Sequence, residues 1–107
     1  DEAEVRRLGK KVQSVGADPV DCPVSGGCHR AATGNIAIFA GCDRAVFDRL
    51  LPVLTILGHR VLHTGPLGSA SVLKVVTNYL ATANLSRFVR HFSPPKWQEW
   101  TSMSPMR

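Results

Sequence analysis

The sequence has 107 residues, of which 44% are hydrophobic and 20% are charged, and thirteen basic residues against eight acidic ones give a formal net charge of +5. This length allows one globular domain with a modest core. No apolar run approaches about 18 residues, the minimum for a membrane span, so we expect no membrane partner. The acidic start, Asp1-Glu2-Ala3-Glu4, is unlike the basic start of a signal peptide.

The basic surplus does not form a pattern typical of nucleic-acid binding. Acids and bases alternate over residues 1–11, as on a solvent-exposed helix, and Arg44, Arg49 and Arg60 are widely spaced. We therefore expect no nucleic-acid partner.

Three cysteines, Cys22, Cys28 and Cys42, are an odd number without C-x-x-C spacing, which argues against a disulfide framework and a zinc site. Adjacent Cys28 and His29 have no matching second pair, so we expect no metal. A reducing compartment, the cytoplasm or the mitochondrial matrix, is the expected location.

The first half of the chain predicts a helix and two strands. Apolar residues at helical spacing predict a helix over residues 2–13, ended by Gly16. Residues 18–24 contain two prolines and predict a brief strand that leads into the turn at residues 25–27. The apolar run within residues 34–41 predicts a strand covered on both faces.

A second helix and a third strand follow. Asp43 is a suitable N-cap for a helix that Gly58 ends, and Pro52 should kink this helix or mark a junction between two segments. Residues 60–63 predict a short strand, and residues 65–68 predict a turn.

A strong helix is expected to begin at Ser69 or Ser71 and to end at about Leu85. The alternation of strands and helices predicts an α/β layer. The pattern leaves open whether the two middle strands pair in parallel or antiparallel.

On this last helix, Lys74, Asn78 and Thr82 recur every four residues and share one face. An ammonium and a carboxamide on one face suit proton transfer to a substrate oxygen and the holding of that oxygen. The alternative is an ordinary polar face of an amphipathic helix, exposed to solvent.

Ser25, Gly26 and Gly27 form the second candidate feature. Two residues without Cβ let the backbone approach a ligand closely, and successive amides with one hydroxyl can hold a carboxylate. The alternative is a tight turn that uses glycine only for its dihedral angles.

Several motifs in this order resemble the β-hydroxyacid dehydrogenase family, which includes 3-hydroxyisobutyrate dehydrogenase and tartronate semialdehyde reductase. The resemblance runs from about residue 2 to residue 85. The matching motifs are Asp21-Cys22-Pro23-Val24-Ser25-Gly26-Gly27, Gly34-Asn35, Gly41, Gly65-Pro66-Leu67-Gly68-Ser69, Lys74 and Asn78.

The resemblance implies that residues 1–68 are the later part of a Rossmann-type dinucleotide-binding domain and that residues 69–86 begin the long interdomain helix. It implies that Ser25, Gly26 and Gly27 bind the substrate carboxylate, that Lys74 is catalytic and that Asn78 holds the substrate and orients the lysine. The implied cofactor is NAD or NADP, the implied substrate is a small β-hydroxyacid or its semialdehyde, and the family is oligomeric.

The sequence also departs from the family. It contains no G-x-G-x-x-G loop for a pyrophosphate and no helical domain after the long helix. We therefore expect a fragment that is inactive as an isolated chain. The alternatives are a small basic protein-interaction module and a non-catalytic isoform that pairs with a full-length partner.

The sequence of residues 87–107 differs from the pattern of the family. Because tryptophan and methionine have single codons, a shifted reading of residues 96–101 gives a segment compatible with the family's A-G-[LMV]-D. We interpret residues 87–107 as an out-of-frame tail without a fixed packing partner; the alternative is an ordinary basic tail that contacts a partner or a membrane.

Overall fold

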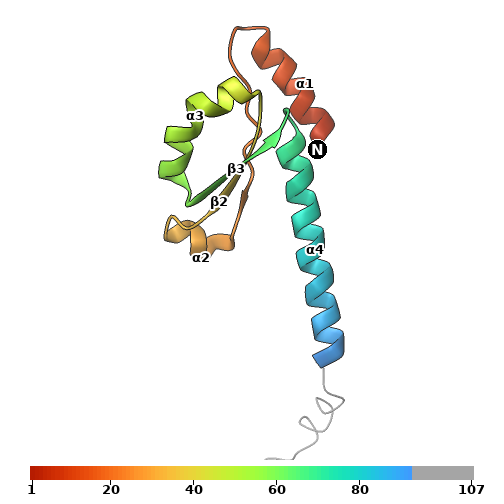
Figure 1. Ribbon diagram of the computed structural model, residues 1–107. Coiled ribbons are helices and arrows are strands. Elements are labelled where there is room, and N and C mark those ends of the chain that lie inside the picture. The colour runs from red at the N-terminus through yellow and green to blue at the C-terminus, as the bar shows by residue number, and fades with distance from the viewer. Residues whose placement is uncertain (93–107) are drawn as a thin grey trace, which may run out of the picture. The chain divides into compact units, whose positions relative to one another are not determined.

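The computed structural model describes residues 1–92 and confirms the α/β class (Figure 1). By contacts the chain divides into two compact units, Asp1–Thr77 and a second that begins at Asn78. Among residues 1–92, no helix combines the length and apolar character of a membrane span. In chain order the elements are α1 (Glu2–Gln13), β1 (Val24–Ser25), α2 (Gly27–Ala32), β2 (Ala37–Gly41), α3 (Arg44–Leu57), β3 (Arg60–Gly65) and α4 (Ser69–Phe92).

The sheet has the strand order β1-β2-β3, with β2 in the centre. Strands β2 and β3 are parallel, which answers the question that the sequence left open, and α3 is the crossover between them. Strand β1 is antiparallel to β2 and is shorter than expected. Before it, only Asp21 forms a bridge, to Gly41, because Pro19 and Pro23 have no N–H to give to a ladder.

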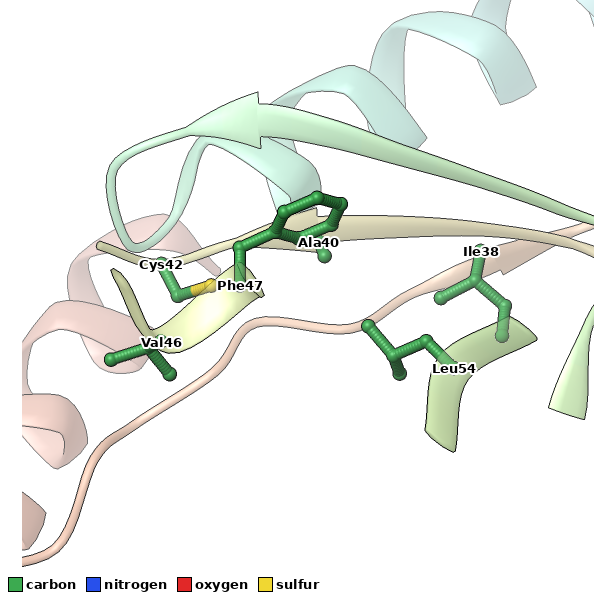
Figure 2. Close-up of a cluster of buried hydrophobic side chains, with 6 residues drawn as sticks. All are labelled: Ile38, Ala40, Cys42, Val46, Phe47 and Leu54. Atoms are coloured by element: carbon green, nitrogen blue, oxygen red, sulfur yellow. The ribbon is translucent and has the colours of Figure 1, made fainter. Parts of the chain in front are cut away.

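The core lies between β2 and α3 (Figure 2). In the figure Leu54 of α3 lies beside Ile38 of β2, while Phe47 lies near Ala40 at the other end of the cluster. Burial of one such large apolar side chain stabilises the fold by about 1.5 to 3 kcal/mol. The buried members are Ile38, Ala40, Cys42, Val46, Phe47 and Leu54.

Coverage of β2 differs from the expectation. Ile38 and Ala40 are buried against α3, whereas Ala37 and Phe39 on the opposite face are only half-buried. The prediction of a strand covered on both faces is therefore confirmed for one face. The apolar run alone does not reveal this, because it contains no polar residue to mark an open side.

Two helix predictions need correction. Helix α3 runs through Pro52 as a single helix, so a junction between two segments there is wrong. Pro52 is exposed, and it has no N–H to donate to the carbonyl four residues earlier in the helix. Helix α4 extends to Phe92, beyond the expected end at Leu85.

The short helix α2 was not expected from the sequence. Its six residues, Gly27–Ala32, span less than two turns and carry no apolar period that would distinguish them from a loop. The prediction for the tail applies mainly to residues 93–107, which lie outside the described residues.

Candidate active site

The turn at Ser25, Gly26 and Gly27 joins β1 to α2. Ser25 is half-buried and pairs with Ala37 of β2. Gly26 is the N-cap of α2 with a φ of 137°, and Gly27 has a φ of 74°. Both values lie in the region that favours glycine, so the turn requires these two residues. No side chain caps α2, which leaves its first amides available to a ligand or water.

The side chain of Arg30 covers one side of this turn. A Cβ placed on Gly26 would lie 3.0 Å from Cδ and 3.2 Å from Cβ of Arg30. The arginine stem therefore packs on the glycine, and a larger residue at position 26 would displace it. Sequence reasoning missed this contact, because α2 itself was not expected.

Asp21 connects the segment before β1 to the start of α4. It is buried, and its carboxylate accepts hydrogen bonds from the backbone N–H of Ser71 at 2.7 Å and from the Ser71 hydroxyl at 2.8 Å. A carboxylate in the first turn of a helix also interacts favourably with the helix dipole. Sequence reasoning included Asp21 in a motif but missed this positioning role, since fifty residues separate it from Ser71.

This junction fixes both candidate elements within the first unit. Ser25 follows Asp21 by four residues, at most about 13 Å of extended chain. Lys74 follows Ser71 by three residues, about 4.5 Å of helix rise. Within residues 1–92 no hydrogen bond joins Lys74 to the turn, and four hollows on the surface of this part of the chain are lined by other residues.

The first two turns of α4 bury a partly polar face and expose an apolar one. Ala70 is fully buried, and Leu73, Lys74 and Thr77 on the same face are half-buried. The opposite face is apolar and exposed, with Val75 at 69% exposure. An ordinary amphipathic helix buries its apolar stripe. Of the three residues on the predicted polar face, Lys74 is half-buried, whereas Asn78 and Thr82 are exposed.

The ammonium of Lys74 has no ion pair or hydrogen bond within residues 1–92; the four ion pairs there involve other residues. Asn78 is exposed and belongs to the second unit. It lies one helical turn after Lys74 on the continuous helix α4, as the spacing predicts.

Cys42 does not supply a reactive centre at this site. Cys42 is 2% exposed. Burial raises the pKa of its thiol, and the neighbouring Cys22 and Asp43 raise it further. A thiol with a raised pKa is protonated at neutral pH and is a poor nucleophile or metal ligand. Within residues 1–92 no group of three or more metal-binding side chains occurs.

Residues 1–65, more than half of the chain, match the family model described as the NAD binding domain of 6-phosphogluconate dehydrogenase. The chain belongs to this family. Its relatives are the hydroxyacid dehydrogenases that the sequence motifs resemble, so the resemblance to the β-hydroxyacid dehydrogenases is confirmed.

Three curated relatives cover most of the chain. The 2-(hydroxymethyl)glutarate dehydrogenase of Eubacterium barkeri is 36% identical over 80 residues, which are 75% of this chain and 27% of that protein. The 2-hydroxy-3-oxopropionate reductase of Escherichia coli is 34% identical over 82 residues, or 77% and 28%. The mitochondrial 3-hydroxyisobutyrate dehydrogenase of Rattus norvegicus is 32% identical over 80 residues, or 75% and 24%. The chain thus spans about a quarter of the length of these relatives.

Solved structures of this family share the fold. The 3-hydroxyisobutyrate dehydrogenase of Mycobacterium tuberculosis, solved with L-serine, superposes with a TM-score of 0.83 at 27% identity over 87% of this chain and 32% of that one. Psf3, solved with NADP+ and 2-OPP, gives a TM-score of 0.80 at 25% identity over 91% of this chain and 34% of that one. The fold is therefore the later part of a Rossmann-type domain followed by the start of a long helix.

Proposed function

We propose that this chain forms the substrate-binding half of an NAD(P)-dependent oxidoreductase that acts on a small β-hydroxyacid or its semialdehyde. The observation that carries the proposal is the position of Lys74, half-buried and, within residues 1–92, without a partner on the covered face of α4. Lys74 forms no ion pair among residues 1–92, so its charge remains available to a substrate. The names of the relatives support the substrate class.

In this proposal the turn binds the substrate carboxylate. The Ser25 hydroxyl and the amides after Gly26 and Gly27 donate hydrogen bonds to it, and the absence of a side-chain cap on α2 leaves those amides available. The positive φ angles at both glycines hold the amides in this arrangement before the ligand arrives.

Lys74 transfers the proton. In reduction its ammonium protonates the oxygen of the carbonyl that becomes the alcohol, and in oxidation its neutral amine takes that proton back. Asn78, one turn further along α4, donates a hydrogen bond to the same oxygen. A nicotinamide would supply or accept the hydride.

We assign no residue of this chain to the dinucleotide. The sequence has no G-x-G-x-x-G loop to hold a pyrophosphate, so the residues present do not fit the whole cofactor. For this reason we propose that the 107 residues tested alone show no turnover. Three free cysteines fit a reducing compartment, cytoplasmic or mitochondrial.

A chimera tests the proposal. Residues 1–85 replace the aligned segment of the E. coli 2-hydroxy-3-oxopropionate reductase, and the Lys74→Ala variant is made in the same background. We expect the chimera to reduce 2-hydroxy-3-oxopropionate and the variant to lose kcat by about 10²- to 10⁴-fold while it still binds NADH. Equal turnover of chimera and variant would refute the assignment of Lys74.

A second candidate function is a non-catalytic isoform that pairs with a longer homologue. The exposed apolar face of α4 favours it, since Val72 and Val76 are 45% and 46% exposed in addition to Val75. Size-exclusion chromatography of the chain mixed with a full-length relative, with Val75→Glu as the disrupting variant, tests this pairing. A small basic interaction module would bind through residues 87–107 and lose binding when they are deleted.

A further inference from the structure

A pocket separate from the candidate active site lies at the amino ends of β2 and β3, between α2 and the residues that precede these strands. It has a volume of about 1030 Å³, at the upper end of typical ligand pockets. Its polar lining consists of His29, Arg30, Thr33, Asn35, His59 and Arg60. We call this set the basic pocket. Figure 1 shows α2 beside the starts of both strands at this end of the sheet.

The fold brings these side chains together from two separate segments, residues 29–37 and 59–60. Thirty residues separate Arg30 from Arg60, which is why no basic cluster is visible in the sequence. Pairing of Ala37 with Arg60 at the start of the parallel ladder sets the two segments side by side. The backbone N–H of His59 donates to the Ile36 carbonyl at 3.0 Å and fixes the adjoining residue.

The α2 side of the basic pocket is also fixed by hydrogen bonds. The Asn35 N–H donates to the Arg30 carbonyl at 2.8 Å, and the Thr33 hydroxyl donates to the carbonyls of His29 and Arg30 at 3.3 and 3.2 Å. These bonds close the helix end without using the guanidinium, the imidazoles or the Asn35 carboxamide. The cationic side chains therefore remain available to a ligand.

No carboxylate from residues 1–92 neutralises the basic pocket. These residues include seven acidic ones, and none of them lines it. Four are in ion pairs with Arg6, Arg7, Arg44 and Arg49, and Asp21 is bound to Ser71. The others, Asp1 and Asp43, precede α1 and α3. Two guanidiniums and two imidazoles thus share one hollow whose lining carries no negative charge.

We propose that the basic pocket binds the phosphoryl group of a small phosphorylated molecule. A phosphoryl group carries about −1.5 to −2 charges at neutral pH and three acceptor oxygens, which suits two guanidiniums with additional N–H donors. Arginine binds such groups in a bidentate manner. The volume leaves room for an organic part beyond the phosphoryl group.

This site is independent of the proposed oxidoreductase function. The pocket lies where the parallel strands begin, whereas open α/β sheets bind their principal ligands at the carboxyl ends of the strands. Arg30 connects the two regions, because its stem packs on Gly26 of the turn.

The test is a titration of the ¹⁵N-labelled chain with pyrophosphate at low ionic strength, followed by NMR. We expect saturable shifts confined to the amides of α2, Asn35, His59 and Arg60. The double variant Arg30→Gln/Arg60→Gln should weaken binding at least tenfold, and each single variant should weaken it by an intermediate factor. Because these side chains are exposed, we expect unchanged spectra elsewhere and an unchanged melting temperature.

The matched control is Arg44→Gln/Arg49→Gln, which removes the same charge from α3. It should leave the affinity for pyrophosphate unchanged.

Equal weakening in both double variants, absence of saturation, or shifts outside the pocket would overturn the proposal. Malonate binding as tightly as pyrophosphate would overturn the phosphoryl assignment. A twelve-base-pair DNA duplex that binds the same residues more tightly than pyrophosphate would overturn the small-ligand assignment.

Discussion

The buried carboxylate of Asp21 binds both the backbone N–H and the hydroxyl of Ser71, fifty residues later in the chain. This contact attaches the first turn of α4 to the segment that leads into β1. The same region is closely packed, since a Cβ on Gly41 would lie 3.1 Å from the Ala70 nitrogen. The position of Lys74 relative to the sheet therefore depends on one charge-assisted interaction and one glycine.

Replacement of Asp21 should destabilise the first unit. Asp21→Ala leaves the Ser71 N–H and hydroxyl without their partner in a partly buried site, and hydrogen bonds to charged groups contribute about 1.5 to 3 kcal/mol. We expect the free energy of unfolding, measured by urea denaturation, to fall by about that amount.

Asp48→Ala is the matched control for Asp21. Its carboxylate forms an exposed ion pair with Arg44 at 2.9 Å, and exposed pairs contribute about 0 to 1 kcal/mol. If the two variants lose equal stability, Asp21 does not hold α4 in solution. Ser71→Ala should give a smaller loss than Asp21→Ala, because it retains the backbone N–H as a donor.

The sequence predicts the elements with strong local signals and misses those that depend on long-range contacts. The apolar spacing predicts α1 and α3 almost to the residue, and Gly58 marks the end of α3. The short length of α2 hides it, and with it the contact between Arg30 and Gly26. Sequence patterns therefore miss an element that is too short to show a period, and they miss the contacts that this element makes.

The orientation of α4 shows a further limit of pattern reasoning. Valines at 72, 75 and 76 form an apolar side of the helix, yet these residues are exposed and Lys74 is on the covered face. A helical period identifies two faces but not which of them meets the sheet. Here the choice is set by the Asp21–Ser71 bonds and by Ala70, whose small side chain permits close approach.

Gly26→Ala should be more disruptive than Gly34→Ala. At Gly26 the φ of 137° is strained for alanine, and the new Cβ would meet the Arg30 side chain at 3.0 Å. At Gly34 the φ is 70°, a left-handed helical value, and no atom lies within 4 Å of the new Cβ. Backbone strain of this kind costs about 1 to 3 kcal/mol. We expect the free energy of unfolding to fall by about 3 kcal/mol in Gly26→Ala and by about 1 kcal/mol in Gly34→Ala.

Thermal or urea denaturation of the two glycine variants measures this difference. An NMR titration with a small β-hydroxyacid that follows the amides of the turn should also distinguish them, with binding lost in Gly26→Ala and retained in Gly34→Ala. Equal stability of the two variants would contradict the strained conformation of the turn.

Lys74→Met should leave the stability of the chain unchanged or raise it. The methionine retains the aliphatic stem of this half-buried residue and removes an ammonium that has no carboxylate partner within residues 1–92. We expect a gain of about 0 to 1 kcal/mol by urea denaturation. Arg49→Met, which breaks the ion pair with Asp18, should not increase stability and serves as the control. A clear loss in Lys74→Met would indicate that the lysine supports the fold.

Ionisation of Cys42 should make the chain less stable at alkaline pH. Burial, together with Cys22 and Asp43, raises the pKa of the Cys42 thiol above its ordinary value of 9.0. The folded state therefore holds this proton more tightly than the unfolded state does. The associated stability is complete below pH 9.0 and is lost as the pH rises through the folded-state pKa.

We expect Cys42→Ala to remove part of the decrease in the free energy of unfolding between neutral and strongly alkaline pH. Cys28→Ala, at an exposed position, should retain the full decrease. Parallel urea titrations of both variants and the parent chain across this pH range measure the effect, and identical pH profiles for the two variants would show that Cys42 does not contribute.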